Sequence, residues 1–439
     1  MKTSTHNDAS TRMAAVSSFV GTAIEWYDFF IFNAATALLI FPKLFFPGAD
    51  PTTDLLKSLS IYAVGFLARP IGGVVCGHFG DRIGRKSMLV LTLLLTGGST
   101  MLIGLLPTYQ QVGVWAPVLL VLLRFAQGFA IGGEWGGAVL MAVEHAPSHR
   151  RGLYGGWPQV GVPVGLFLSN VFFFGLIANM PEGAQLAGWW RVPFLFSILL
   201  VGLGLYVRLS LAESPAFEEI KETPSRVPLR DVWRWHHKDV LLAMGAKVAE
   251  NGIFYLYTVF VITFAVGRGF QRTSVLIAIS LASLFTMASI PVFSALSDRF
   301  GRRIIYLFGS VFAGVFAFPS FVLIETGRVA LMTVAVVLAM AVGWAAMYAP
   351  QASFFSELFE TRVRYSGASL GAQVATIFSG GLMQIVAAGL FGRTGSYYPV
   401  ALIAIVMSAV TTFSVFLATE TFRRDLGIGG FGRERVAET

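Results

Sequence analysis

The sequence predicts an all-α membrane protein with twelve transmembrane helices in two pseudo-symmetric six-helix halves. Three observations lead to this fold class: few charged residues, long apolar segments, and a motif that occurs once in each half. Only 13% of the 439 residues are charged and 55% are hydrophobic, whereas soluble proteins carry about 25% charged residues. A soluble fold could not bury this much apolar surface. The composition therefore excludes a soluble enzyme, a secreted domain, a disordered protein and a coiled coil.

Twelve apolar segments are each long enough to cross a hydrocarbon core, which takes about 20 residues. We place them at 14–41, 55–79, 87–107, 115–143, 154–178, 190–212, 240–267, 273–297, 303–324, 329–356, 366–391 and 397–419. The one long polar stretch, 213–239, separates six spans from six. We therefore expect an N-terminal half over 1–212, a cytoplasmic linker over 213–239, and a C-terminal half with a short cytoplasmic tail over 240–439.

Lysine and arginine are distributed unevenly between the loops. With the N-terminus inside, 22 of the 32 Lys and Arg residues lie in inside segments, 7 lie outside and 3 lie within spans. The positive-inside rule then puts both termini in the cytoplasm. We expect a multi-pass protein of the plasma (inner) membrane. It also explains the net charge of +8 without a nucleic-acid partner. The single cysteine, Cys76, allows no intramolecular disulfide, and the histidines show no metal-ligand pattern, so we expect neither metal nor cofactor.

An internal repeat links the two halves. The loops after the second and eighth spans both contain Asp-Arg-x-Gly-Arg, and their acidic residues, Asp81 and Asp298, lie 217 positions apart. A second repeated feature, at an offset of 213 residues, consists of two Glu–Arg pairs: Glu144 with Arg151, and Glu357 with Arg364. Duplicated halves that face a site near the bilayer midplane are a transporter architecture.

These loops are predicted to form a cytoplasmic gate. An Asp at the end of one helix can accept hydrogen bonds from the N-terminus of another helix and can pair with nearby Arg. The alternative is that the basic residues only anchor the loops inside, and we favour it for the individual Arg residues but not for Asp81. The candidate gate residues are Asp81, Arg82, Arg85, Asp298, Arg299, Arg302, Glu144, Arg151, Glu357 and Arg364.

Several segments resemble a known family. GTAIEWYDFFIF (21–32), FLARPIGGVVCGHFGDRIGRK (66–86) and RFAQGFAIGGEWGGA (124–138) together look like the metabolite:proton symporter family of the major facilitator superfamily. That family includes carriers for shikimate, 2-oxoglutarate, citrate, and proline or betaine. Further agreement comes from PQVGVPVG (158–165), WRVPF (190–194), ESPAF (213–217) and ELFETRVRYSGAS (357–369), so the resemblance covers nearly the whole chain. Glu360 departs from the pattern, because related carriers often have Pro there.

The resemblance implies a monomer with the major facilitator fold that imports a small polar metabolite together with protons. The metabolite would be an organic acid or, alternatively, a zwitterionic osmolyte. An uncoupled facilitator or an exporter could have the same fold, because a fold does not determine coupling. No Ser-His or His-x-x-x-His pattern occurs within the spans, so we do not expect an enzyme.

Seven ionisable residues lie within the spans, where each costs about 2.5–3.5 kcal/mol at a helix centre unless it has a partner or a function. Glu25 and Asp28 are three residues apart and so share a helix face. Burial and mutual repulsion favour the protonated form of one of them, and we predict that one carries the coupling proton. The alternative is a structural carboxylate held by Arg69 or Arg124. Asp28→Asn is expected to abolish gradient-driven uptake.

The remaining intramembrane polar residues are candidates for substrate binding. Arg cannot deprotonate, so Arg69 and Arg124 need anionic partners or a wet cavity; for Arg69 we favour pairing over a carboxylate clamp. The seventh span carries a polar stripe, whose alternative role is a Lys247–Glu250 pair in a helix seam. The candidates are Arg124, Arg69, Glu134, Gln159, Lys247, Glu250, Asn251, Tyr255, Tyr348, Gln351 and Gln373. The charges of the seven ionisable residues within the spans sum to −1, so the count alone indicates no strong preference for an anion.

Overall fold

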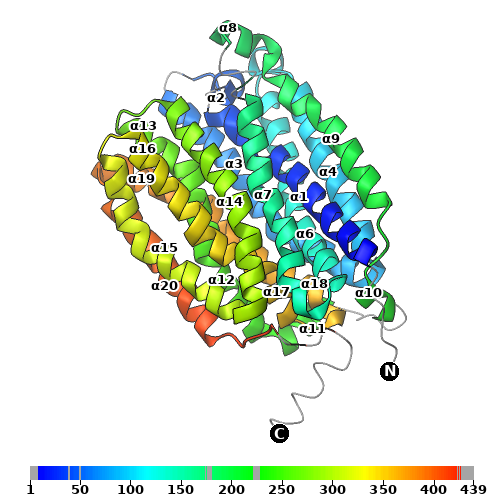
Figure 1. Ribbon diagram of the computed structural model, residues 1–439. Coiled ribbons are helices and arrows are strands. Elements are labelled where there is room, and N and C mark those ends of the chain that lie inside the picture. Colours follow the sequence, from blue (N-terminus) through cyan, green and yellow to red (C-terminus); the bar gives the residue numbers. More distant parts are fainter. Residues whose placement is uncertain are drawn as a thin grey trace.

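The computed structural model describes residues 8–37, 40–48, 51–173, 175, 180–220, 228–422, 424 and 426. Every regular element in these residues is a helix (Figure 1). Within this described part, nine helical segments are long and apolar enough to cross a membrane. Three more long helices, α1 (Asp8–Ala37), α3 (Pro51–Ile83) and α7 (Arg151–Phe172), bring the number of spans to twelve. The prediction of an all-α membrane fold is confirmed.

The predicted spans overlap the observed helices one for one. The other spans are α4 (Arg85–Leu105), α6 (Trp115–Glu144), α9 (Arg191–Leu209), α12 (His237–Tyr255) with η4 (Leu256–Phe260) and α13 (Val261–Gly267), α14 (Arg272–Phe300), α15 (Arg302–Glu325), α16 (Val329–Leu338) with η5 (Ala339–Trp344) and α17 (Ala345–Leu358), α18 (Arg364–Thr376) with η7 (Ile377–Leu382) and α19 (Met383–Thr394), and α20 (Tyr398–Leu417).

Short helices join the spans. They are α2 (Ile40–Phe45), α5 (Tyr109–Val112), η1 (Ser148–Arg150), α8 (Glu182–Ala184), η3 (Gln185–Trp189), η6 (Thr361–Val363), and two helices in the linker, α10 (Pro215–Ile220) and α11 (Pro228–Trp235). Helix α1 begins and α20 ends at the same end of the bundle, the lower end in Figure 1. We call this the inner end, and the end that carries α2 and α8 the outer end.

The repeated motif makes the same tight turn in both halves. Gly84 (φ 111°) joins α3 to α4, and Gly301 (φ 103°) joins α14 to α15. Glycine adopts this left-handed backbone region without the steric cost that a Cβ would add. The repeat in the sequence is therefore also a repeat in backbone conformation.

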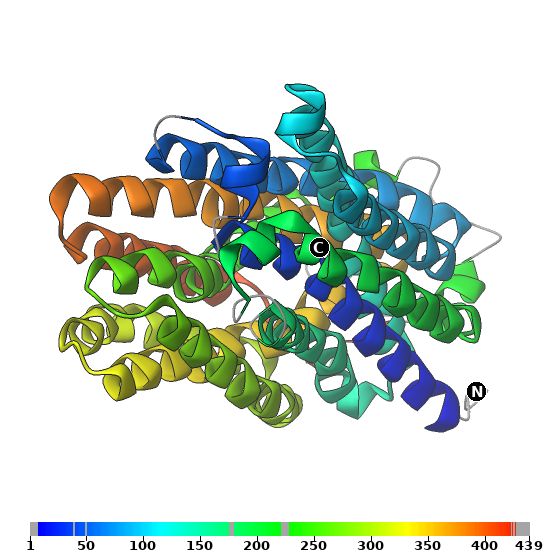
Figure 2. The same cartoon turned by 90° about the horizontal axis from the view of Figure 1, so that it is seen from above.

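Helices up to α9 pack mainly on one another, as do helices from α12 onward, and the two groups meet along α7 with α14 and α17, and along α3 with α18 (Figure 2). Helices α3 and α6 approach backbone to backbone. A Cβ on Gly72 would lie 1.7 Å from the carbonyl oxygen of Phe129, and one on Gly132 would lie 1.9 Å from that of Arg69. These glycines fix the position of Arg69 relative to α6.

Candidate functional site

A small cavity of about 30 Å³ lies between the two groups of helices. Its walls come from α1, α3, α6 and α7 on one side, and from α12, η5, α17 and α18 on the other. The lining residues are Thr22, Glu25, Trp26, Arg69, Ile131, Trp135, Val162, Lys247, Glu250, Asn251, Phe254, Trp344, Tyr348, Gln373 and Thr376. Of the predicted intramembrane residues, seven reach this cavity: Glu25, Arg69, Lys247, Glu250, Asn251, Tyr348 and Gln373.

Arg69 is a buried cation in the cavity wall, with 2% of its surface exposed. Its Cζ lies 4.3 Å from the ring centroid of Phe66, 4.6 Å from that of Phe29 and 5.4 Å from that of Trp26. Its Nη2 donates a 3.3 Å hydrogen bond to the hydroxyl of Tyr255. Among the described residues, no carboxylate lies within 4.0 Å of Arg69. The expected pairing of Arg69 with a buried acid is therefore absent from this part of the chain.

Glu25 and Asp28 have different surroundings. Glu25 lines the cavity, and its Oε1 has no hydrogen-bond partner in the described part of the chain. Asp28 accepts a hydrogen bond from Ser197 Oγ on α9 and does not line the cavity. A spacing of three residues separates two side chains by about 60° around a helix. That offset is enough to turn Asp28 toward α9 while Glu25 faces the C-terminal half.

Arg124, the other predicted carboxylate clamp, lies outside the cavity lining. Its Cζ lies 4.2 Å from the ring centroid of Phe29 and 4.3 Å from that of Phe32. Its Nη1 donates a 3.0 Å hydrogen bond to Gln127 Oε1. The ring of Phe29 thus contacts both guanidinium groups. Of the two arginines, the structure brings Arg69 to the cavity.

Lys247 and Glu250 form an ion pair in the cavity wall, with 2.5 Å between Nζ and Oε2. Gln351 accepts a 2.9 Å hydrogen bond from Lys247 and donates one of 3.3 Å to Glu250. Trp344 Nε1 donates to the second Glu250 oxygen at 2.9 Å. The sequence offered two roles for the polar stripe on the seventh span, substrate binding or a Lys247–Glu250 pair. The structure contains the pair. The pair itself contributes no net charge to the cavity.

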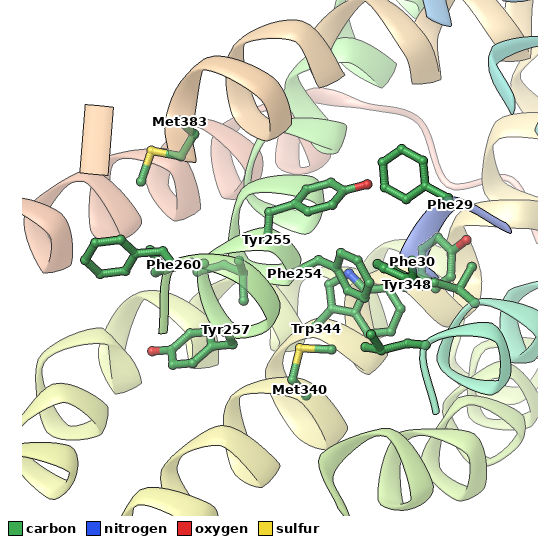
Figure 3. Packing of buried hydrophobic residues seen from close by; sticks show 14 of the residues in the cluster. Phe29, Phe30, Phe254, Tyr255, Tyr257, Phe260, Met340, Trp344, Tyr348 and Met383 are labelled. Atoms are coloured by element: carbon green, nitrogen blue, oxygen red, sulfur yellow. The ribbon is translucent and has the colours of Figure 1, made fainter. Parts of the chain in front are cut away.

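Polar and aromatic contacts connect the two halves around the cavity. Gln159 on α7 donates a 2.8 Å hydrogen bond to the carbonyl of Tyr348 and accepts one of 3.2 Å from Trp135 Nε1. Figure 3 shows Phe30, Phe254, Trp344 and Tyr348 close together. Phe30 and Phe254 have ring centroids 5.9 Å apart, and Trp344 stacks on Tyr348 at 4.5 Å. Asn251, deeper in the wall, donates a 3.1 Å hydrogen bond to Ser379.

Glu134 is paired outside the cavity. Its carboxylate forms an ion pair with Arg208 on α9, and Arg208 also donates to the carbonyl of Leu89. In this conformation Glu134 is paired with Arg208 and does not line the cavity. Sequence reasoning missed Arg208 because the count of loop charges assigns it to an inside segment, although it falls within the predicted span 190–212. With Arg208 included, the buried charges sum to zero, not −1.

A second, larger cavity, of about 350 Å³, lies between α1, α7, α13 and α14 toward the outer end. Asn33, Thr36 and Asn170 line it on one side, and Thr258, Thr263 and Arg272 line it on the other. It lies between the same two groups of helices as the central cavity. At the opposite, inner end, the repeated loops close the space between the halves.

Each motif aspartate binds the first turn of a helix in the other half. Asp81 accepts hydrogen bonds from the backbone N–H groups of Tyr365 (3.1 Å) and Ser366 (2.9 Å) at the start of α18. Asp298 accepts them from Gly152 (2.7 Å) and Leu153 (2.8 Å) at the start of α7. A carboxylate at a helix N-terminus also interacts favourably with the helix dipole.

Buried arginines and glutamates surround these contacts. Arg364 binds Glu144 across the two halves at 2.9 Å, Arg85 lies 3.5 Å from Glu144, and Arg302 binds Glu357 at 3.1 Å. Arg151 donates a 2.6 Å hydrogen bond to the carbonyl of Arg424. Arg82 and Arg299 are exposed and form no ion pair with any residue that the structure describes. Their exposure fits the alternative interpretation, in which basic loop residues only anchor the chain at the inside.

Two gate residues escaped the sequence reasoning. Glu213 accepts hydrogen bonds from the backbone N–H groups of Arg85 and Lys86, and Glu420 accepts them from Arg302 and Arg303. The residue after each also matches, because Ser214 donates to Glu144 and Thr421 donates to Glu357. The sequence does contain a pattern that could have predicted them. Glu-Ser follows the sixth span and Glu-Thr follows the twelfth, at an offset close to that of the repeated motif.

The sequence profile described as Major Facilitator Superfamily matches residues 19–381. The chain belongs to this superfamily. It is 40% identical to the inner membrane metabolite transport protein YhjE of Escherichia coli (strain K12), with 95% of this chain and 96% of that protein covered. It is 37% identical to the shikimate transporter (94% and 95% covered) and 32% identical to the proline/betaine transporter (96% and 86% covered) of the same organism.

Among solved structures, the proton:xylose symporter XylE bound to 6-bromo-6-deoxy-D-glucose has the same fold, with a TM-score of 0.77 at 14% identity and coverage of 95% of this chain and 98% of that one. Two sequence-based expectations are thereby confirmed: the twelve-helix major facilitator fold and the resemblance to metabolite carriers. This major facilitator protein is a multi-pass membrane transporter of metabolites and not an enzyme.

Proposed function

We propose that this protein imports a small organic acid with one carboxylate together with a proton, by alternating access. The substrate binds in the central cavity, between an N-terminal half over 1–212 and a C-terminal half over 240–439. Both termini face the cytoplasm in the inner membrane, the protein acts as a monomer, and the proton is its coupling ion without any further cofactor. The observation that carries the proposal is Arg69, a buried guanidinium in the cavity wall without a carboxylate partner among the described residues.

The charges of the cavity wall explain why an anion would bind. Lys247 and Glu250 neutralise each other. Arg69 therefore supplies an uncompensated positive charge, which is costly in a buried site unless an anion or water balances it. A carboxylate can accept two parallel hydrogen bonds from a guanidinium, which adds orientation to the charge interaction. The surrounding rings of Trp26, Phe29 and Phe66 hold the guanidinium in place and offer apolar surface.

Glu25 accounts for coupling. When Glu25 is ionised, it cancels the charge of Arg69 and repels a carboxylate. When it is protonated, the cavity carries one positive charge that a monoanion neutralises. Proton and substrate then favour each other's binding, and linkage makes this effect reciprocal. We assign the coupling proton to Glu25 rather than Asp28, because Glu25 lines the cavity and Asp28 is hydrogen-bonded to Ser197 outside it.

The inner gate completes the cycle. In this conformation, Asp81 and Asp298 bind helix N-termini of the opposite half, so the inner end is closed. Substrate and proton enter from the outer end, past the second cavity. The two halves then rotate about the site, the aspartates release α18 and α7, and the inner end opens. This sequence of states matches the parallel repeat of the superfamily.

Uptake by purified protein in proteoliposomes tests the proposal. The panel is labelled shikimate, 2-oxoglutarate, citrate, proline and betaine, each with and without an inward proton gradient. Gradient-driven accumulation of a monocarboxylate, lost in Arg69→Gln and retained in Arg82→Gln, supports the proposal. Arg82 is a matched control because it is exposed and lies outside the cavity. Accumulation of a monocarboxylate that survives Arg69→Gln would overturn the role of Arg69.

A zwitterionic osmolyte is the second candidate substrate. Trp26, Trp135, Trp344 and Tyr348 line the cavity together with Glu25, and aromatic faces bind quaternary ammonium groups. In that case the cationic group lies against these aromatic rings, and Arg69 binds the carboxylate. Accumulation of proline or betaine only would select this candidate. Equal equilibration of every compound with and without the gradient would instead indicate an uncoupled facilitator, and efflux against the gradient an exporter.

A further inference from the structure

Helix α11 and the start of α12 present a basic and aromatic surface at the inner end. Trp233 and Trp235 are 60% and 57% exposed, and Arg230, Arg234 and Lys238 are also exposed. We call these five residues the basic-aromatic surface. The opposite side of the same segment is buried through Val232, His236 and Val240. The acids of this segment, Asp231 and Asp239, are half-buried, and Asp239 contacts His236 at 3.2 Å. The exposed side is therefore positively charged.

An apolar groove begins where this surface ends. It has a volume of about 430 Å³ and lies between α12, the segment α18–η7–α19, and α20. The lining residues are Leu241, Met244, Gly245, Val248, Ala375, Phe378, Ser379, Met383, Ile403 and Met407. Leu241 and Phe378 are 54% and 65% exposed, so the groove is open to the side of the bundle. All three walls belong to membrane-spanning helices, so the groove opens toward the hydrocarbon core.

Of the basic-aromatic surface, Lys238 lies on α12, the helix that also lines the groove, and the other four residues lie on the preceding α11. Lys238 and Leu241 are three residues apart in α12, and Leu241, Met244, Gly245 and Val248 follow the spacing of a single face. Val248 lies about 10 Å from Leu241 along the helix axis. A basic end at the membrane surface followed by an apolar groove into the bilayer matches the two parts of one anionic phospholipid.

We propose that this face binds an anionic phospholipid, with its phosphate at Arg234 and Lys238 and one acyl chain in the groove. The flanking Trp233 and Trp235 occupy the interfacial layer, where indole rings are preferred in membranes. A zwitterionic lipid fits the groove equally well but gains less from the basic end. A water-soluble anion fits only the basic end. The proposal concerns the lipid environment of the transporter and does not depend on the identity of its substrate.

Thermal unfolding of the full-length protein, purified in detergent and titrated with dioleoyl phosphatidylglycerol or dioleoyl phosphatidylcholine, tests this site. Wild type is expected to be stabilised at lower concentrations by the anionic lipid. Each basic residue near an anionic lipid contributes about 1 kcal/mol, so Arg234→Gln/Lys238→Gln should weaken apparent phosphatidylglycerol affinity about 30-fold and leave phosphatidylcholine unchanged. The control Arg82→Gln/Arg299→Gln removes two exposed arginines at the same end and should behave as wild type.

A second variant tests the groove. Val248→Phe adds volume to its wall and should weaken the effect of both lipids, whereas inorganic phosphate should have no effect on any variant. Native mass spectrometry of the same samples counts bound phosphatidylglycerol independently of stability. Equal stabilisation of wild type by the two lipids would overturn the proposal, as would unchanged phosphatidylglycerol selectivity in Arg234→Gln/Lys238→Gln. If inorganic phosphate stabilised the protein as much as phosphatidylglycerol does, only the basic residues would be needed for binding. That result would also overturn the proposal.

Discussion

Arg69 is held by three aromatic rings and one tyrosine hydroxyl, none of which neutralises its charge. A hydrogen bond to a charged group contributes about 1.5–3 kcal/mol, so Arg69→Gln should raise the KM for the transported acid about 10- to 100-fold. Arg69→Lys keeps the positive charge but loses the planar guanidinium that can donate two parallel hydrogen bonds. Its KM should therefore lie between those of wild type and Arg69→Gln. Initial rates of uptake in proteoliposomes measure this order. Equal KM values for all three proteins would contradict the clamp.

Glu25 and Asp28 can be separated by experiment. Glu25→Gln imitates the protonated carboxyl permanently, so we expect it to exchange substrate across the membrane but not to accumulate it against a gradient. Asp28→Asn keeps the hydrogen-bonding shape beside Ser197, and we expect it to retain accumulation. Counterflow and gradient-driven uptake of the same preparations give the two readouts. Loss of accumulation in Asp28→Asn alone would move the coupling proton to Asp28, which the sequence left open as an alternative to Glu25.

The Glu134–Arg208 pair predicts a stability effect. Both side chains are buried, so Glu134→Gln leaves the charge of Arg208 without its partner. Breaking a buried pair costs about 3–5 kcal/mol, whereas replacing both members with apolar residues costs much less. We therefore expect Glu134→Leu/Arg208→Leu to unfold at a higher temperature than Glu134→Gln. Thermal unfolding in detergent checks this order, and a double variant less stable than the single one would contradict it.

At this scale, the sequence identified most of the ionisable residues within the spans and offered the Lys247–Glu250 pair, but it did not identify the partner of Glu134. Residue type and position within a span showed that Arg69 and Arg124 are buried. Which of them reaches the cavity depends on the packing of α3 against α6, where Gly72 and Gly132 allow backbone contact. Such long-range contacts are not encoded in local spacing. Arg208 was missed for a simpler reason, since the positive-inside rule counts a basic residue near a span end as anchored in the loop.

At the scale of elements, the inner gate depends on two helix N-termini. Asp81 is fully buried and binds the first turn of α18, so Asp81→Asn should weaken the closed state by removing the charge from a charge–dipole contact. Cys76 reports on this change, because it is the single cysteine, 1% exposed, and packs in one cluster with Tyr365. We expect a thiol reagent to modify Cys76 several-fold faster in Asp81→Asn than in wild type.

Two further variants complete this test. Asp298→Asn should also speed the modification of Cys76, because release of α7 opens the same end of the molecule. Glu182→Gln lies in α8 at the outer end and should leave the rate unchanged. A faster reaction in Glu182→Gln, or none in Asp81→Asn, would show that Cys76 does not report on this gate.

The repeated motif allowed these aspartates to be predicted, whereas Glu213 and Glu420 were not. Asp81 and Asp298 stand in a motif that recurs, and their position at a helix end suggested capping. Glu213 and Glu420 occupy segments with only a two-residue similarity, and their partners are backbone groups at Arg85 and Arg302 in sequence-distant helices. A two-residue similarity such as Glu-Ser and Glu-Thr can be recognised as a repeat only once the longer Asp-Arg-x-Gly-Arg motif has shown how many residues separate equivalent positions in the two halves.

At the scale of the whole molecule, the halves repeat their gate contacts but not their cavity walls. The N-terminal half contributes Glu25 and Arg69, which form no ion pair within the part of the chain that the structure describes, and the C-terminal half contributes the closed pair Lys247–Glu250. The fold could be predicted because it follows from span count, linker and repeat. The asymmetry of the cavity could not, because the repeat is strongest at the inner loops and weakest along the cavity walls.

This asymmetry determines the charge that crosses the membrane in one transport cycle. If Glu25 takes up one proton and Arg69 one monocarboxylate, the loaded cavity has the same charge as the empty one, and each cycle moves no net charge. Uptake of the organic acid should then respond to an imposed pH gradient. It should not respond to a potassium diffusion potential set with valinomycin at equal pH. A zwitterion carried with one proton would instead move one positive charge inward and accelerate when the interior is negative. Measuring uptake under the two gradients separately distinguishes these cases, and acceleration of monocarboxylate uptake by an inside-negative potential would contradict a single proton on Glu25.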